Sequence, residues 1–180
     1  DSHCHLDYPE LSGELDAVIE RARLAGVGMM LSIGTRLSEF SRVLAVAEKL
    51  PQVYCSVGVH PHEAEKEGQG EAAALIAQAR HPKVVGIGES GLDFYYEHSG
   101  RDAQERNFRA HIAAARATGL PLIVHSRDAD REMAAVLGEV MRRGEFTGVM
   151  HCFSSGPELA QAALALGFYG LEWARAGGAL

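Results

Sequence analysis

The chain has 180 residues, of which 47% are hydrophobic and 23% charged, as expected for a globular domain with a sizeable core. Its formal net charge of −7 provides no basic surface for nucleic acid, so a bound phosphate would need metal ions. No apolar run approaches the roughly 18 residues that cross a bilayer, and we expect no membrane contact. Three cysteines without CxxC spacing fit a protein of the reducing cytoplasm. The chain begins at Asp1 without a secretory signal, and we expect its natural start to have been trimmed.

Short β-branched or apolar runs alternate with longer alanine- and leucine-rich stretches, which is the pattern of repeated βα units. In chain order, the pattern predicts a strand over 1–5, a helix over 14–25, a strand over 26–34, a helix over 38–50, a strand over 53–60, a helix over 71–79, a strand over 84–90, a helix over 103–118, a strand over 120–126, a helix over 129–143, a strand over 147–155 and a helix over 157–166. No low-complexity linker interrupts this series, so we expect a single domain over 1–180.

Polar residues gather at the ends of these apolar strands. His5, His60, Glu89, His125 and His151 each lie at or just after the C-terminal end of a predicted strand. Strands that are apolar along most of their length favour a parallel sheet covered on both faces, in which all these ends point the same way. Active sites of (β/α) barrels form at that face, whereas a doubly wound sheet would spread the strand ends along an open edge. The sequence therefore predicts an α/β fold of the TIM-barrel type with six to seven βα units.

The same residues have the chemistry of a metal site. A His-x-His pair on a strand directs both side chains to one face, so His3 and His5 can clasp one ion. A strand-end carboxylate, Glu89, and two strand-end imidazoles, His125 and His151, complete a set that packing alone does not explain. These five ligands exceed the needs of one structural ion, and a carboxylate can bridge two. Two divalent ions would activate a water and neutralise a phosphate, which points to hydrolysis of a phosphodiester or similar bond.

Other polar residues lie near these ligands in the sequence. His60 and His62 flank a proline in "GVHPHEA", and one of them could donate to a substrate phosphate, although both could be ordinary loop histidines. Asp93, Arg127 and the neighbouring Asp128 could orient ligand imidazoles, contact substrate or form loop ion pairs.

Three further histidines and an aromatic run are less closely tied to the site. We expect His81, His98 and His111 on loop or helix surfaces. The run "FYY" over 94–96 could stack a base, although core packing is expected for at least one of the rings.

The segments "DSHCHLD", "GVHPHEA", "IGESGLDFYY", "LPLIVHSRDA" and "HCFSS" followed by "LGFY" resemble, in this order, the signature segments of the TatD family of metal-dependent deoxyribonucleases. The resemblance extends over about residues 1–170. It implies a TIM-type barrel of the amidohydrolase-like group, a divalent-metal centre and hydrolysis of DNA phosphodiesters, often from the 3′ end.

The resemblance also implies roles for individual residues. His3 and His5 would hold one ion, Glu89 would bridge, and His125 and His151 would hold the second ion. It further suggests that His62 faces the scissile phosphate.

The chain departs from the family pattern at two places. Ser90 replaces the usual Ile of Gly-Glu-Ile-Gly-Leu-Asp, which should change packing more than chemistry. After "GFY" the chain continues as "GLEWARAGGAL", without the later strand whose Asp completes the family's metal site. A barrel of this type usually needs about 250 residues, so we expect the C-terminal part to be missing or divergent after about Gly170. A shortened chain, a frameshifted reading frame, omitted and renumbered residues, and strands supplied by a partner chain would each account for this.

Together these observations predict a metal-dependent hydrolase, a TatD-like deoxyribonuclease that acts as a 3′-exonuclease on single-stranded DNA or 3′ ends. We expect two divalent ions, Mg²⁺, Mn²⁺ or Zn²⁺, and a metal-activated water as the nucleophile. Glu89 is the predicted catalytic residue, and the predicted substrate-binding residues are His62, Asp93 and Arg127. Two alternatives remain: another hydrolase on the same scaffold, such as a deacylase, lactonase or amidohydrolase, and a truncated fragment that binds metal without turnover.

Overall fold

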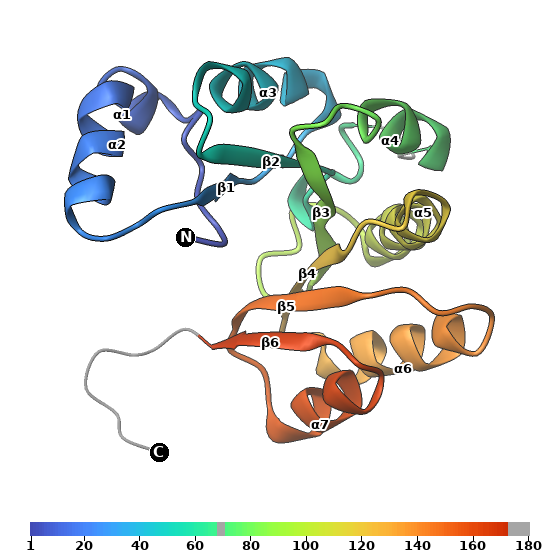
Figure 1. Cartoon of the computed structure of the whole chain (residues 1–180). Helices are drawn as coiled ribbons and strands as arrows, with labels where there is room; N and C mark the ends of the chain where they lie inside the picture. The colour runs from blue at the N-terminus through green and yellow to red at the C-terminus, as the bar shows by residue number, and fades with distance from the viewer. Residues whose placement is uncertain (68–70, 173–180) are drawn as a thin grey trace.

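A computed structural model describes residues 1–67 and 71–172 of the chain (Figure 1). Its strands are β1 (Met30–Ser32), β2 (Val53–Val57), β3 (Val84–Asp93), β4 (Leu122–Arg127), β5 (Gly148–Phe153) and β6 (Tyr169–Glu172). Its α-helices are α1 (Pro9–Ser12), α2 (Leu15–Leu24), α3 (Phe40–Lys49), α4 (Ala72–Gln78), α5 (Arg101–Thr118), α6 (Asp130–Met141) and α7 (Pro157–Ala165). Two short 3-10 helices, η1 (Leu37–Glu39) and η2 (Pro61–Glu63), precede α3 and follow β2. Most of the expected divergent tail, at 173–180, lies outside the described residues.

The six strands form one parallel sheet in the order β1-β2-β3-β4-β5-β6. Neighbours in the sheet are therefore successive in the chain, whereas a doubly wound sheet reverses direction at a switch point. The sheet curves from β1 to β6, and helices α3 to α7 line its outer side (Figure 1). The predicted α/β fold of TIM-barrel type is confirmed, as an open segment of a barrel. Within residues 1–67 and 71–172, β1 and β6 are the two edges and do not pair with each other.

The predicted strand over 1–5 forms only in part. Three backbone hydrogen bonds hold this segment beside β1: Leu31 N–H donates to Asp1, Cys4 N–H donates to Leu31, and Ile33 N–H donates to Cys4. The pairing amounts to a single parallel bridge between Cys4 and Ser32, because the chain turns away directly after His5. The expectation of a regular strand there is wrong, but the segment still lies along the sheet edge. β6 lies beyond the six strands predicted from the sequence and provides the seventh strand position.

All six predicted helices form, and each begins and ends within two residues of its predicted bounds. They bury one apolar face each against the sheet, as their helical spacing indicates. Phe108 of α5, Met133 and Leu137 of α6 and Leu159 of α7 are almost completely buried against strand residues such as Leu122. No helix among the described residues is both long enough and apolar enough to cross a membrane.

β3 and β4 approach each other closely at Gly91, which pairs with His125. Gly91 has φ +154°, a conformation that L side chains rarely adopt, and a Cβ atom there would collide with the backbone carbonyl of His125. Glycine at this position therefore allows β4 to present His125 next to β3.

The substitution Gly91→Ala should lower the free energy of unfolding by about 3 kcal/mol, because it adds both backbone strain and a steric clash. Gly28→Ala is the matched control, since a Cβ atom at Gly28 would meet nothing within 4 Å. Urea denaturation of both variants tests this prediction. Equal stability of the two variants would show that the close approach of β3 and β4 is not required.

Candidate metal centre

Glu89 lies within β3 and is only 4% exposed, although carboxylates are rarely buried without a partner. Four imidazoles surround it. The Glu89 carboxylate lies 2.5 Å from Nε2 of His151, 3.5 Å from Nε2 of His3, 3.6 Å from Nε2 of His60 and 4.0 Å from Nδ1 of His125. The histidines come from the N-terminal segment, the turn after β2, and strands β4 and β5, so the predicted convergence at the C-terminal ends of the strands is present in the structure.

Two groups of side chains offer ligand atoms that lie within 4.8 Å of one another, and both include Glu89. The first group contains His3, His5 and Glu89, and the second contains His60, Glu89 and His125. A carboxylate common to two groups has two oxygens with which it could serve two ions. This is the arrangement that a bridging role for Glu89 requires.

His60 is better placed to donate a hydrogen bond than to bind metal. Its Nδ1 accepts the backbone N–H of His62 at 3.1 Å. Burial lowers the pKa of His60 to about 3, with Glu89 opposing this shift, so the ring is neutral near pH 7 and its proton must sit on Nε2. The nearest Glu89 oxygen to this nitrogen, Oε1, lies 3.6 Å away. A protonated Nε2 has no lone pair for a metal ion.

His151 lies between His3 of the first group and His125 of the second. Its ring stacks on His3 with a centroid distance of 3.9 Å, and its Nε2 lies 3.4 Å from Nδ1 of His125. Within the part of the chain that the structure describes, the buried Nδ1 atoms of His3, His5 and His151 have no hydrogen-bond partner. Buried polar atoms are normally satisfied, so these orphaned nitrogens and the buried carboxylate fit a divalent metal centre.

The electrostatics of the cluster also favour a cation. Burial lowers the pKa of His3 to about 4 despite the nearby Glu89, so this imidazole is neutral near pH 7. Burial would raise the pKa of Glu89, but the hydrogen bond with His151 holds it well below its usual range. An ionised carboxylate beside a neutral His3 and a neutral His60 lacks a compensating positive charge from them, and such burial is costly. A bound metal ion would supply that charge.

Asp93, at the end of β3, is fully buried and supports two of the histidines. Its Oδ2 lies 2.9 Å from Nε2 of His62 and 3.1 Å from Nε2 of His125. Burial opposes its ionisation, but the hydrogen bond from His125 and those from backbone N–H groups and His62 lower the pKa of Asp93 well below its usual range. An ionised Asp93 accepts a hydrogen bond from Nε2–H of His125, which leaves Nδ1 of His125 without a proton, 4.0 Å from Glu89. This carboxylate–imidazole pair is the usual way to orient a metal-binding histidine.

The three predicted substrate-binding residues lie in different environments. His62 and Asp93 are hydrogen-bonded to each other, and Asp93 is inaccessible beneath the imidazoles, which favours the orienting role considered above. Arg127 lies at the end of β4, with its guanidinium over the rings of Tyr95 and Tyr96. His98 is exposed beside His62, as expected for a loop residue.

Helix α5 contributes a buried polar stripe that the sequence did not reveal. His111 is completely buried, so its expected surface position is wrong. Its Nε2 accepts the backbone N–H of Val59 at 2.9 Å, and its Nδ1 donates to the carbonyl of Asn107 at 2.7 Å. Asn107 donates to the carbonyl of Val59 at 2.8 Å and to Ser90 Oγ at 3.1 Å. These bonds fix the residues directly beside His60 and Glu89.

The remaining member of the stripe is Gln104. It accepts the backbone N–H of Asp93 at 2.8 Å and donates to the carbonyls of Asp93 and Ser99 at 3.0 and 2.9 Å. Positions 104, 107 and 111 have helical spacing, and that regular spacing of polar residues was the available signal. Their polar character favours a solvent-facing position, which is why the sequence was misleading.

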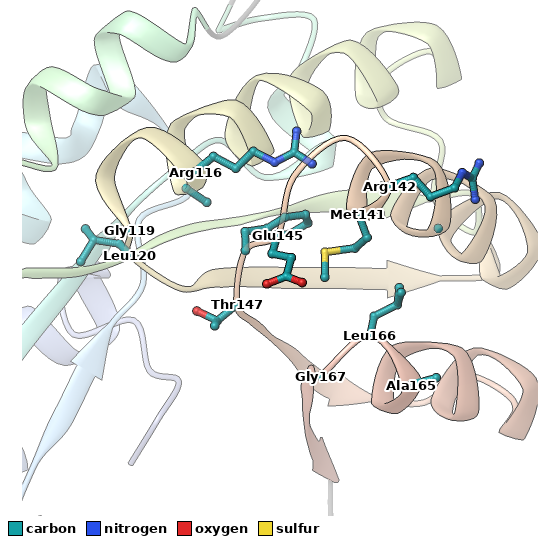
Figure 2. Close-up of a pocket in the computed structure, with 13 residues that line it drawn as sticks. Arg116, Gly119, Leu120, Met141, Arg142, Glu145, Thr147, Ala165, Leu166 and Gly167 are labelled. Atoms are coloured by element: carbon teal, nitrogen blue, oxygen red, sulfur yellow. The ribbon is translucent and has the colours of Figure 1, made fainter.

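A pocket of about 900 Å³ lies at the opposite end of the strands (Figure 2). It is lined by the segments that precede β4, β5 and β6, together with the last turns of α5 and α6. Arg116 reaches into this region, but its guanidinium donates to the carbonyls of Val140 and Gly144. This pocket is separate from the metal centre, because the two lie at opposite ends of the parallel strands.

The sequentially wound parallel sheet and the imidazole–carboxylate cluster at its C-terminal end define a class of protein: the (β/α)-barrel metal-dependent hydrolases. The family model described as "TatD related DNase" matches residues 1–170. The chain belongs to this family, and the resemblance inferred from the five sequence segments is confirmed.

Individual relatives agree with this assignment. The chain is 33% identical to the uncharacterized metal-dependent hydrolase YabD of Bacillus subtilis, over 94% of this chain and 66% of that protein. It is 40% identical to the 3'-5' ssDNA/RNA exonuclease TatD of Cronobacter turicensis, over 86% of this chain and 58% of that protein. The crystal structure of YJJV, a TatD homolog from Escherichia coli, superposes with a TM-score of 0.85 at 33% identity and covers 94% of this chain and 66% of that one. The chain thus spans less than two thirds of the length of these relatives.

Replacing Asp93 by Asn should weaken divalent-metal binding by about ten- to a hundred-fold, because the amide cannot fix the tautomer and orientation of His125 as the carboxylate does. Isothermal titration with Mn²⁺ or Zn²⁺ measures this change. Asp102→Asn, an exposed change in the first turn of α5, is the control. Unchanged affinity in Asp93→Asn would contradict the orienting role.

Replacing His111 by Leu should lower the free energy of unfolding by about 2 kcal/mol, because the buried N–H of Val59 would lose its acceptor. His81→Leu serves as the control, since His81 is partly exposed and pairs with Glu48 at the surface. Chemical denaturation of both variants provides the measurement. Similar stability losses in the two variants would show that the α5 stripe does not hold the chain at Val59.

Proposed function

We propose that the chain provides the metal centre of a hydrolase that cleaves phosphodiester bonds of single-stranded nucleic acid from the 3′ end. The observation that carries this proposal is the buried Glu89 carboxylate, which lies within 4.0 Å of ring nitrogens of His3, His125 and His151. Membership of the TatD-related DNase family supports a metal-dependent hydrolase. Relatives named 3'-5' ssDNA/RNA exonuclease support the substrate class.

In this proposal His3 and His5 would hold one ion, His125 and His151 would hold the second, and Glu89 would serve both. Divalent ions bound there would activate a water, neutralise the phosphate and stabilise the leaving oxygen. Mg²⁺, Mn²⁺ and Zn²⁺ are all compatible with mixed ligands, and the number of imidazoles favours the transition metals.

The surrounding residues prepare the site for its substrate. His60 lies beside Glu89, with its Nε2 atom 3.6 Å from Oε1 of the carboxylate. His62 donates its Nε2–H to Asp93, which leaves Nδ1 of His62 as an acceptor for a water beside the scissile phosphate. Arg127 provides a positive charge for the nucleic-acid backbone. All three cysteines are unpaired, which supports a cytoplasmic location as part of the proposal.

The decisive experiment counts metal ions per chain by elemental analysis and assays 3′-exonuclease activity on labelled single-stranded DNA and RNA, with and without chelator. About two ions and cleavage that the chelator abolishes would support the proposal. A parallel panel of esters, lactones and amides tests the alternative hydrolases. Metal binding without cleavage of any substrate would contradict an active nuclease and favour a non-catalytic metal-binding chain.

Glu89→Gln should lower the metal content to one ion or fewer and reduce cleavage by about a thousand-fold or more, because the neutral amide cannot serve two cations. Thermal unfolding adds a readout that is independent of activity. Metal should raise the melting temperature of the wild-type chain but hardly that of Glu89→Gln. Glu132→Gln, an exposed change on α6, is the matched control. Full cleavage or a wild-type metal response in Glu89→Gln would exclude a bridging role.

A further inference from the structure

An exposed aromatic surface adjoins the metal centre at the turn after β3. It consists of Tyr95, Tyr96, His98 and Arg127, and is called the aromatic ledge below. Tyr95 and Tyr96 are 57% and 48% exposed, which is high for large aromatic side chains. Core packing therefore does not explain these two rings. Phe94, the third member of the run, is partly buried and lies against Arg101.

The ledge is built from stacked groups. The Arg127 guanidinium carbon lies 4.3 Å from the centre of the Tyr95 ring and 4.8 Å from that of the Tyr96 ring. His98 stacks nearly parallel to Tyr96, with a centroid distance of 5.6 Å and an interplanar angle of 5°. A guanidinium stacked on rings is held in one orientation, while its N–H edge stays available for a phosphate. Tyr96 also contacts the Tyr95 ring edge to face at 4.7 Å between centroids, and Tyr95 stays more than half exposed beside both neighbours.

Hydrogen bonds hold the ledge in place beforehand. The backbone N–H groups of Tyr95 and Tyr96 donate to Oδ1 of Asp93 at 3.1 and 2.9 Å. The N–H of Phe94 donates to the carbonyl of Arg127 at 2.9 Å, which ties the turn to β4. A platform fixed in this way loses little conformational entropy when a ligand binds.

Position and charge identify the ligand. The Tyr96 ring lies 5.4 Å from that of His62, and His62 shares Asp93 with His125. Arg127 forms no salt bridge with any residue in 1–67 or 71–172, in a chain whose formal net charge is −7. A flat apolar face next to an unneutralised cation complements a nucleobase and its phosphate.

We propose that the aromatic ledge binds one nucleotide of single-stranded nucleic acid, with its base stacked on Tyr95 and its phosphate bonded to Arg127. This inference rests on the proposed function, because it gives the metal centre a site for a nucleotide next to the bond that is cleaved. Stacking on a tyrosine face favours a nucleotide that carries a base over one that lacks it, but it hardly discriminates between the different bases. The ledge therefore favours unpaired strands of any sequence, since bases within a duplex cannot reach the ring.

The test measures binding rather than cleavage. Fluorescence anisotropy of the whole chain in chelator compares a short single-stranded oligonucleotide with a strand of equal length whose 3′-terminal nucleotides lack bases. We expect the wild-type chain to prefer the base-bearing strand by about ten-fold. Tyr95→Ala should remove the preference and Tyr95→Phe should retain it, because the phenyl ring still stacks. Arg127→Gln should weaken both strands similarly and reduce the salt dependence of binding by about one phosphate contact.

Tyr169→Ala is the matched control, because Tyr169 is 74% exposed at the start of β6, the end of the sheet away from the metal centre. Three results would contradict nucleotide binding at the ledge. They are no preference in the wild-type chain, no binding at all, and equal effects of Tyr95→Ala and Tyr169→Ala. The nuclease assay separates this inference from the proposed function. Base-dependent binding without cleavage would overturn the exonuclease and leave the ledge, whereas cleavage with base-independent binding would do the reverse.

Discussion

The buried carboxylate of Glu89 is the constraint on which the surrounding cluster of histidines depends. Burial removes its hydration, and the two imidazoles with strongly lowered pKa values, His3 and His60, offer it no positive charge at neutral pH. The ionised carboxylate is then stabilised in the interior by its contact with His151 and, when one is bound, by a cation. The stability of this part of the sheet and its capacity to bind metal are thus two aspects of one electrostatic requirement. His3 is neutral, and neutrality is the state in which an imidazole can bind a metal ion.

The chain meets this requirement through backbone placement as much as through the side chains that face the cluster. Parallel strands in sequential order bring residues from both ends of the sequence to one edge. Gly91 allows β4 to approach β3 closely, so that His125 reaches the cluster. Asn107 and His111 on α5 then fix the chain at Val59 and Ser90, each of which adjoins a residue of the cluster. Small shifts of these backbones would move several ligands together.

Features that follow from local periodicity were predictable from the sequence, whereas features that depend on a distant partner were not. Helices and central strands are predictable from apolar spacing, but the end of β3 was not: β3 continues to Asp93, so Glu89 lies within the strand and not at its end. The partial strand around Cys4 was overestimated, because pairing with β1 and the turn after His5 decide its length. The tautomer of His60 depends on the backbone N–H of the residue two positions later. The conformation of the turn brings these two groups together, and the sequence alone does not reveal that conformation. His111 was misplaced because a polar side chain can be buried once it finds a backbone partner.

Asp93 connects the metal centre to the surface around it. Its Oδ2 atom orients His62 and His125, and its Oδ1 atom accepts the backbone N–H groups of Tyr95 and Tyr96. One rigid carboxylate therefore sets the positions of the His125 imidazole and of an exposed ring at the same time. Because its two oxygens are fixed relative to each other, the distance from the cluster to the aromatic ledge is determined by a single buried side chain. A substrate that used both surfaces would meet a spacing already set by the fold, and little of its binding energy would be spent on arranging the site.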